Sequence, residues 1–273
     1  MKFTSVASAL LLAGAAVAAP SKLQQRRHER SAKRMEGRRS LRPLAVNATS
    51  LEDVIVADNP DEVTYSSNWA GAVIVGTDIT EVTGTFTIPT VTIPSGGNSR
   101  TEYGAAAWVG IDGDTCESAI LQTGVEFLIE GSETEYAAWY EWYPDYSYEF
   151  SDFDVSPGDE IKATVIATSE TAGTATLENL STGDSVTHTF SNEASLGSLC
   201  LTNAEWIVED FESDSELVPF ADFGTVTFTD ASYVTDGTTE GVSGATIFDV
   251  EQSNEVVTSC GTSGSSEVYC TYE

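Results

Sequence analysis

The chain has 273 residues, of which 43 are acidic and 12 basic, and its formal net charge at pH 7 is −31. Ten of the twelve basic residues lie between Lys2 and Arg42. The chain from Glu62 onward contains 37 acidic residues and only two basic ones, Arg100 and Lys162, which gives a formal charge of −35. Such a surface repels nucleic acid and anionic membranes, so we expect neither as a partner. With so few cations, the chain also escapes the charge repulsion that unfolds ordinary proteins in acid, which indicates adaptation to acid.

The N-terminus has the features of an export signal. An apolar run from Val6 to Val17 is too short to span a bilayer, and Ala16-Val17-Ala18 fits a signal peptidase site. We therefore predict a signal peptide over residues 1–18 and a secreted, extracellular product.

Residues 19–61 differ from everything after them, because most of the basic residues fall here. We interpret this stretch as a propeptide that lies across the acidic domain at neutral pH as an intramolecular inhibitor, and that loosens as carboxylates protonate. The alternative is a disordered basic tail without an inhibitory role.

Residues 62–273 have an all-β pattern: short runs rich in Val, Thr, Ile, Phe and Tyr are broken by Gly, Pro, Asp and Ser about every ten residues. Residues 160–168 alternate between polar and apolar, and residues 174–180 and 185–190 are expected as neighbouring strands. No amphipathic helix is indicated. We predict a single domain of some fourteen strands, a concanavalin-like antiparallel β-sandwich of two long sheets of about seven strands each.

Four cysteines, an even number in an exported chain, predict two disulfides with three alternative pairings. We favour Cys116 with Cys200, and Cys260 with Cys270, since the latter two bracket a turn-rich hairpin connection. There is no Cys-x-x-Cys, and one histidine follows the propeptide, so we expect no metal and no cofactor.

Three hydrolase or metal sites are disfavoured by residue content. A histidine-based triad would need His188, which stands in a plain strand pattern and is expected on the surface. The two Asp-Thr/Ser-Gly turns of an aspartic peptidase are absent. Asp112-Gly113-Asp114 resembles the start of a calcium loop, but Thr123 stands where a bidentate Glu belongs.

Two strands place carboxylates among large apolar side chains. In WYEWYP (139–144), a period of two puts Trp139, Glu141 and Tyr143 on one face, opposite Tyr140 and Trp142. This face suits a substrate cleft, and equally an aromatic core strand whose Glu141 is hydrogen-bonded structurally.

In NAEWIVEDF (203–211), Glu205 shares a face with Ile207, Glu209 and Phe211. Partial desolvation there raises the pKa of a Glu toward the range useful for acid-base chemistry. With so many carboxylates in the chain, this pattern alone does not single out Glu205.

A resemblance does single it out. In order and spacing, six segments resemble the glutamic peptidases (eqolisins) of filamentous fungi, and the match covers nearly everything after Thr64. The segments are YSSNWAG (65–71), AWVGIDGD (107–114), ILQTG (120–124), WYEWYP (139–144), NAEWIVEDF (203–211) and FGTV (223–226).

The resemblance implies a β-sandwich endopeptidase that acts on proteins or peptides at acid pH, is insensitive to pepstatin, and uses a Gln/Glu pair. Matched motif to motif, the catalytic pair is Gln122 and Glu205, and the residues expected around the cleft are Trp69, Asp112, Trp139 and Glu141. Ala137 departs from the pattern, since an acidic residue is expected there. The propeptide would be removed proteolytically, leaving a mature chain that begins near residues 62–64 and that we predict to be a monomer.

In the expected reaction Glu205 takes a proton from a bound water and later delivers it to the leaving nitrogen, while Gln122 stabilises the oxyanion. Two other functions stay open: a secreted glycoside hydrolase using Glu141 and Glu205, and a non-catalytic glycan-binding protein with Trp69, Trp108 and Trp139 as stacking platforms.

Overall fold

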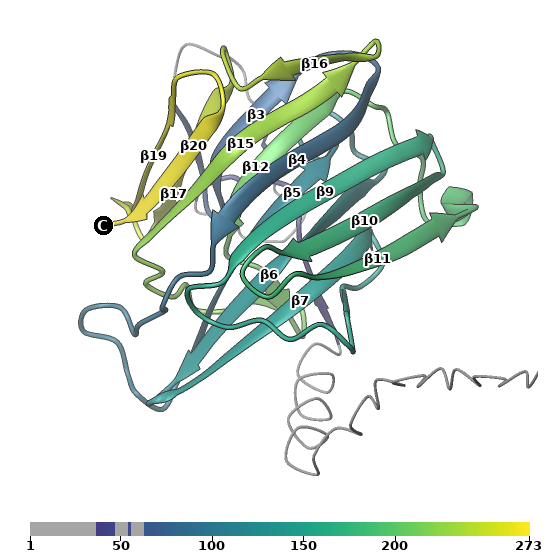
Figure 1. The fold of residues 1–273 in the computed structure, drawn as a ribbon. Coiled ribbons are helices and arrows are strands. Elements are labelled where there is room, and N and C mark those ends of the chain that lie inside the picture. Colours follow the sequence, from purple (N-terminus) through teal and green to yellow (C-terminus); the bar gives the residue numbers. More distant parts are fainter. Residues whose placement is uncertain (1–36, 47–53, 56–62) are drawn as a thin grey trace, which may run out of the picture.

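A computed structural model describes residues 37–46, 54–55 and 63–273 (Figure 1). The predicted signal peptide, and most of the predicted propeptide, lie outside these residues. Within them, no helix is long and apolar enough to cross a membrane.

Two large sheets stack face to face (Figure 1). The nine-stranded sheet has the order β18-β17-β3-β12-β5-β6-β7-β8, with β2 paired to β17. Its strands are β2 (Thr64–Ser66), β3 (Trp69–Val75), β5 (Glu102–Ile111), β6 (Ile120–Glu130), β7 (Glu133–Tyr143), β8 (Tyr148–Glu149), β12 (Asn203–Glu209), β17 (Thr246–Gln252) and β18 (Glu255–Val256).

The eight-stranded sheet has the order β11-β10-β9-β4-β15-β20-β19, with β16 paired to β15. Its strands are β4 (Ile79–Thr87), β9 (Glu160–Ser169), β10 (Ala172–Asn179), β11 (Asp184–Ser191), β15 (Thr225–Thr235), β16 (Thr238–Gly241), β19 (Thr258–Ser263) and β20 (Glu267–Tyr272). A 3₁₀ turn, η1 (Glu193–Ser195), follows β11 and is the one helical element among the described residues.

The predicted all-β sandwich is confirmed. The three strands expected around residues 160–190 form the consecutive antiparallel pairs β9–β10 and β10–β11. Both sheets exceed the predicted seven strands because short strands add to their edges; β8 and β18, for example, have two residues each. Strands this short carry too little periodicity to be read from sequence.

The alternation of side chains across the nine-stranded sheet separates two apolar clusters. Trp142, Trp206 and Val208 point between the sheets and join the main core. Trp69, Trp108 and Trp139 point to the other side, where they pack with Ile207 and Phe211 in a second cluster. The faces predicted from a period of two for strands β7 and β12 are thus both confirmed.

A third, small sheet lies against that second cluster. It joins β1 (Arg38–Arg39) to β13 (Glu212–Ser213) and β14 (Glu216–Leu217), with Arg38 opposite Ser213 and Arg39 opposite Glu212. Residues 37–46, here called the leader segment, therefore cross the outer face of the nine-stranded sheet (purple in Figure 1).

Both disulfides have the pairing favoured from sequence. Cys116–Cys200 ties the loop after β5 to the loop before β12, and Cys260–Cys270 joins directly opposite residues of β19 and β20.

Candidate active site

Four residues stand in one row across the nine-stranded sheet. Glu205 on β12 is opposite Gly110 on β5; Gly110 is opposite Gln122 on β6; and Gln122 is opposite Glu141 on β7. The side chains of Glu205, Gln122 and Glu141 face the second cluster, and position 110 does too. Each of the four lies two residues along its strand from a residue of that cluster. Strand pairing thus brings together Glu205 and Gln122, which are 83 residues apart in sequence.

Gly110 leaves room between Glu205 and Gln122. A Cβ built on Gly110 would lie 3.2 Å from Oε2 of Glu205 and 2.8 Å from ring carbon Cζ3 of Trp108. The Glu205 side chain therefore extends over Gly110, toward the strand that carries Gln122. Any side chain at position 110 would occupy the space beside Oε2 of Glu205 and the ring of Trp108.

The row contains buried polar atoms with no hydrogen-bond partner among the described residues. They are Oε2 of Glu205, Oε1 and Nε2 of Gln122, and Oε1 of Glu141. These three side chains are 0% exposed. Buried polar groups are nearly always paired, so a cluster of unpaired donors and acceptors is a feature of a site that binds something else.

Burial raises the pKa of Glu205 well above its ordinary value, and the nearby carboxylates of Asp112 and Asp114 raise it further. The backbone N–H of Asp114 donates to Oε1 of Glu205 at 3.3 Å and opposes the shift, as does the charge of Arg42. The direction agrees with the prediction made from the apolar face that Glu205 shares with Ile207 and Phe211.

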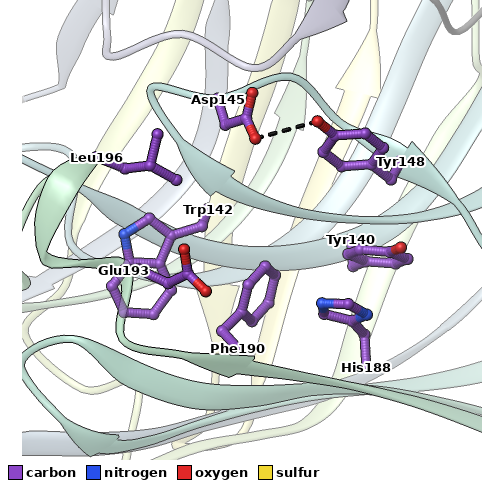
Figure 2. Close-up of a pocket in the computed structure, with 8 residues that line it drawn as sticks. All are labelled: Tyr140, Trp142, Asp145, Tyr148, His188, Phe190, Glu193 and Leu196. Atoms are coloured by element: carbon purple, nitrogen blue, oxygen red, sulfur yellow. Dashed lines mark hydrogen bonds between the residues drawn. The ribbon is translucent and has the colours of Figure 1, made fainter.

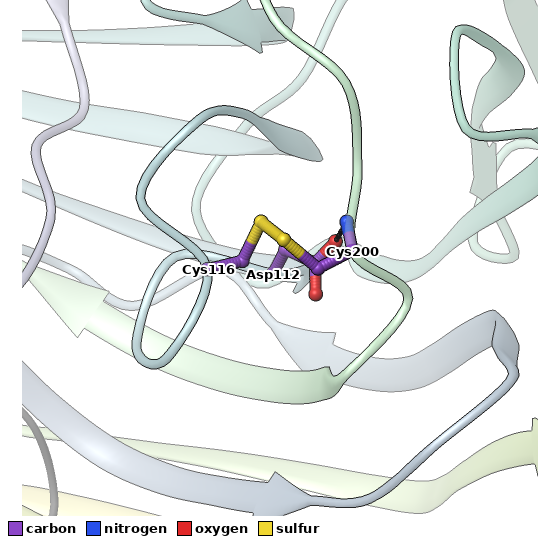
Figure 3. A group of neighbouring side chains, drawn as sticks. All are labelled: Asp112, Cys116 and Cys200. Atoms are coloured by element: carbon purple, nitrogen blue, oxygen red, sulfur yellow. Dashed lines mark hydrogen bonds between the residues drawn. A yellow bond between two sulfur atoms is a disulfide. The ribbon is translucent and has the colours of Figure 1, made fainter.

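Asp112 holds the loop that leads into β12. Its two oxygens accept the backbone N–H groups of residues 200–203 at 2.7 to 3.1 Å, and Asp112 itself has a positive φ of 70°. Figure 3 shows its proximity to Cys116 and Cys200. Because those two sulfurs are joined in a disulfide, neither is a thiolate ligand for a metal. The assignment of Asp112 to the substrate cleft stays a prediction.

Three tryptophans of the second cluster lie on the same face of the sheet as the row. Trp69 and Trp108 meet edge to face, with centroids 5.1 Å apart. Nε1 of Trp108 donates to Glu209 at 2.9 Å, and Nε1 of Trp69 donates to the carbonyl of Leu41 at 2.8 Å. Trp139 lies in the same cluster, 2% exposed.

The leader segment covers the row and is held through its backbone. The N–H of Ser40 donates to Glu141 at 3.0 Å, and the N–H of Leu41 donates to Glu209 at 2.8 Å. Burial is the main cause of the raised pKa values of both carboxyl groups, with that of Glu209 reaching about 8. At these two positions the carboxylates on the sheet bind the backbone of the segment and not its side chains.

Arg38 occupies an acidic pocket beside the row. Its guanidinium pairs with Glu126 and, at 3.1 Å, with Glu102, and it lies 5.4 Å from the centroid of the Phe211 ring. Burial raises the pKa of Glu126 to about 7, although the charge of Arg38 opposes this. Glu126 is directly opposite Ala137 on β7, so the acidic group that the family pattern expects at position 137 is supplied by the neighbouring strand.

Two further arginines of the leader segment bind at the margins. Arg39 donates to Glu212 at 3.0 Å with 29% of its side chain exposed. Arg42 donates to the carbonyls of Gly113 and Asp114 at 2.9 and 2.8 Å, in the same loop whose N–H reaches Glu205.

Sequence reasoning did not assign Glu209, Glu126 and Ser147 to the site. Glu209 shares the Glu205 face at a spacing of four, which was a usable signal, and Glu126 shares the Gln122 face in the same way. Ser147, whose N–H and Oγ donate to the carbonyl of Arg38 at 3.0 and 3.1 Å, lies in a turn with no periodic pattern to reveal it.

The Peptidase A4 family profile matches residues 67–272. The chain therefore belongs to the Peptidase A4 (eqolisin) family, whose members are glutamic peptidases, and it is an endopeptidase of that type.

Two curated relatives span nearly the whole chain. Aspergillopepsin-2 of Aspergillus niger is 51% identical over 280 residues, covering 97% of this chain and 98% of the relative. Scytalidopepsin B of Scytalidium lignicola is 46% identical over 281 residues, covering 100% of both.

Solved structures agree with this assignment. Scytalido-glutamic peptidase with a transition state analog inhibitor superposes with a TM-score of 0.69 at 48% identity, covering 76% of this chain and 98% of that one. Aspergilloglutamic peptidase from Aspergillus niger superposes with a TM-score of 0.60 at 61% identity, covering 63% of this chain and 99% of that one.

Proposed function

We propose that this protein is a secreted, pepstatin-insensitive acid endopeptidase in which Glu205 and Gln122 form the catalytic pair. The observation that supports this most directly is their common neighbour Gly110, which is opposite both residues in the sheet and lies beneath Oε2 of Glu205, while the polar atoms of Gln122 on the next strand are buried and unpaired. A relative of known structure has been crystallised with a transition state analog inhibitor, and another with a tripeptide, which fits a cleft for extended peptides.

The reaction needs no covalent intermediate. Ionised Glu205 removes a proton from a water held between Glu205 and Oε1 of Gln122, and the water oxygen attacks the scissile carbonyl carbon. Nε2 of Gln122 donates to the oxygen that gains negative charge, a contribution whose loss typically costs about 10² to 10³ in rate. Glu205 then delivers the proton to the leaving nitrogen.

The raised pKa of Glu205 bears on when this chemistry can start. A protonated Glu205 cannot accept a proton from water, and burial is the main cause of its raised pKa. Removal of the segment admits water to the cleft, which lowers the desolvation of the carboxylate and hence its pKa, and it also removes the charge of Arg42, a smaller influence in the opposite direction. The precursor is thus inactive because its cleft is filled, and the raised pKa of its base disfavours the ionised form that the reaction needs.

The leader segment accordingly acts as an intramolecular inhibitor. It binds Glu141 and Glu209 through backbone N–H groups and Glu126 through Arg38, and the residues 38, 40, 41, 42 and 44 are all under 10% exposed. A disordered tail without an inhibitory role does not account for these contacts. A mature chain beginning near residues 62–64 would retain none of them.

A glycoside hydrolase using Glu141 and Glu205 is disfavoured by the row itself. The two residues are three strands apart, about 14 Å between Cα atoms at the usual strand spacing, with Gln122 between them. Glycosidases place the scissile bond between their two carboxyl groups, whereas here a strand between the two carboxylates carries the amide of Gln122.

The test is digestion of casein at about pH 3.5 in the presence of pepstatin, after acid activation of the secreted precursor. Glu205→Gln and Gln122→Ala are expected to be inactive while keeping the wild-type melting temperature. Glu240→Gln, a change of the same chemistry on the exposed strand β16, should retain full activity. Near-normal activity of either site variant would contradict the proposed pair.

A further inference from the structure

A separate recess opens at the edge of the sandwich, away from the row of Glu205 and Gln122. It has a volume of about 240 Å³ and is lined by Tyr140, Trp142, Asp145, Tyr148, His188, Phe190, Glu193 and Leu196 (Figure 2). Tyr140 and Trp142 point into it from the face of β7 opposite to Glu141. The recess, here called the edge pocket, is therefore separate from the cleft beneath the leader segment.

Five of its eight lining residues carry aromatic rings. The imidazole of His188 stacks on Tyr140 with centroids 3.9 Å apart and planes 9° from parallel, so this residue of the edge strand β11 is half-buried. Tyr148 stacks on the same Tyr140 at 5.9 Å, and Phe190 packs against Trp142 at 5.5 Å. Ring faces carry partial negative charge and attract organic cations.

Two half-buried carboxylates complete the edge pocket from different elements. Asp145 comes from the turn after β7 and accepts the Tyr148 hydroxyl at 3.1 Å; Glu193 comes from η1 and accepts the N–H of Ser191 at 3.1 Å. Each carboxylate retains further acceptor capacity. None of the residues lining the pocket is Lys or Arg, and burial lowers the pKa of His188.

We propose that the edge pocket binds the guanidinium or ammonium group of a basic polypeptide side chain. Aromatic faces combined with two carboxylates from opposite sides suit such a cation. A neutral sugar also stacks on aromatic rings and donates its hydroxyls to carboxylates, but it brings no positive charge to this rim.

The edge pocket lies next to the contact that holds the leader segment in the cleft. Asp145 and Tyr148 flank Ser147, whose N–H and Oγ hold the carbonyl of Arg38 at the end of the cleft. A polypeptide leaving the cleft past Arg38 therefore meets the turn that forms the edge pocket. The cation has two sources: the basic residues before Gly37, which lie outside the described residues, or an extended substrate.

His188 provides a direct reporter, because it is the only histidine after the propeptide. The imidazole resonance of His188 is followed by proton NMR at pH 6 while mature enzyme is titrated with N-acetyl-arginine amide. The neutral isostere N-acetyl-citrulline amide serves as the matched probe. The readout is binding alone, so it does not depend on the proposed catalytic pair.

We expect a saturable shift with the arginine probe, at a Kd of about 1 to 10 mM, and none with the citrulline probe. Asp145→Asn and Glu193→Gln should each weaken binding about threefold or more, and Glu240→Gln should leave it unchanged. Equal binding of both probes, wild-type affinity in both pocket variants, or a saturable shift with cellobiose would each overturn the proposal.

The same titration on the full-length precursor, with His28→Gln to remove the second histidine, separates the two sources. Absence of the shift in the precursor, with the shift present in the mature enzyme, assigns the edge pocket to the propeptide. A shift in both forms assigns it to substrates.

Discussion

Replacement of Arg38 by alanine should abolish most of the affinity of the leader segment for the mature enzyme. Arg38 makes two ion pairs, to Glu126 and Glu102, and lies over Phe211 with 2% of its side chain exposed. Breaking a buried pair costs about 3 to 5 kcal/mol. At 1.36 kcal/mol for each factor of ten, the dissociation constant should rise about 10² to 5 × 10³-fold.

Arg39 is the matched control, since it is adjacent in sequence and has the same charge. It makes one ion pair, to Glu212, with 29% of its side chain exposed, so Arg39→Ala should cost about 1 kcal/mol, or fivefold. The assay is calorimetric titration of mature enzyme with synthetic peptides of residues 37–46 at pH 8, above the pKa of about 7 of Glu126. Equal losses for the two alanine peptides would refute the reasoning, because the charge alone would then account for binding.

Three further outcomes are expected. Gly110→Ala should reduce kcat at least a hundredfold with little change in KM, because its Cβ would enter the space beside Oε2 of Glu205. Gly76→Ala, on the margin of the sheet, should leave kcat unchanged. Steady-state kinetics with a peptide substrate distinguishes the two variants. The melting temperature of the mature enzyme should be higher at pH 4 than at pH 7. Burial raises the pKa of Asp249 to about 6 and that of Asp210 well above its ordinary value. The folded state therefore holds more protons than the unfolded chain, and it loses stability as the pH rises from about 4 through 6. Asp210→Asn should flatten that dependence in a calorimetric melting series, and an unchanged slope would exclude Asp210 as a contributor. The carboxyl carbon of Glu205, labelled with carbon-13, should titrate at a lower pH in the mature enzyme than in the precursor; equal pKa values would show that the leader segment does not desolvate it.

Much of the architecture could be predicted because it depends on local alternation. A period of two correctly divided Trp139 and Glu141 from Tyr140 and Trp142, and it placed Glu205 on an apolar face, which is why burial raises its pKa. Neither result required knowledge of which strand lies beside which.

The composition of the site could not be predicted in the same way, because it depends on long-range register. The alternation puts Glu126 on the same face as Gln122, but only the pairing of β6 with β7 sets it opposite Ala137, and only the path of the leader segment brings Arg38 to it. His188 shows the same limit: its strand is an edge strand with an exposed pattern, yet the fold of the sandwich brings Tyr140 against its ring.

The single row of Glu205, Gly110, Gln122 and Glu141 explains why one cleft can serve both inhibitor and substrate. The backbone N–H groups of the adjacent residues Ser40 and Leu41 donate to Glu141, at one end of the row, and to Glu209, which lies four residues beyond Glu205 along β12. The unpaired atoms of Glu205 and Gln122 receive no N–H or C=O from the described residues of the segment. A chain that is bound beside these two side chains without engaging them blocks the cleft without being positioned for attack, which is the difference between an inhibitor and a substrate. It follows that a peptide bound by the same carboxylates, Glu141 and Glu209, would be cleaved if its carbonyl reached Nε2 of Gln122. The leader segment is spared by its register on the sheet more than by its sequence.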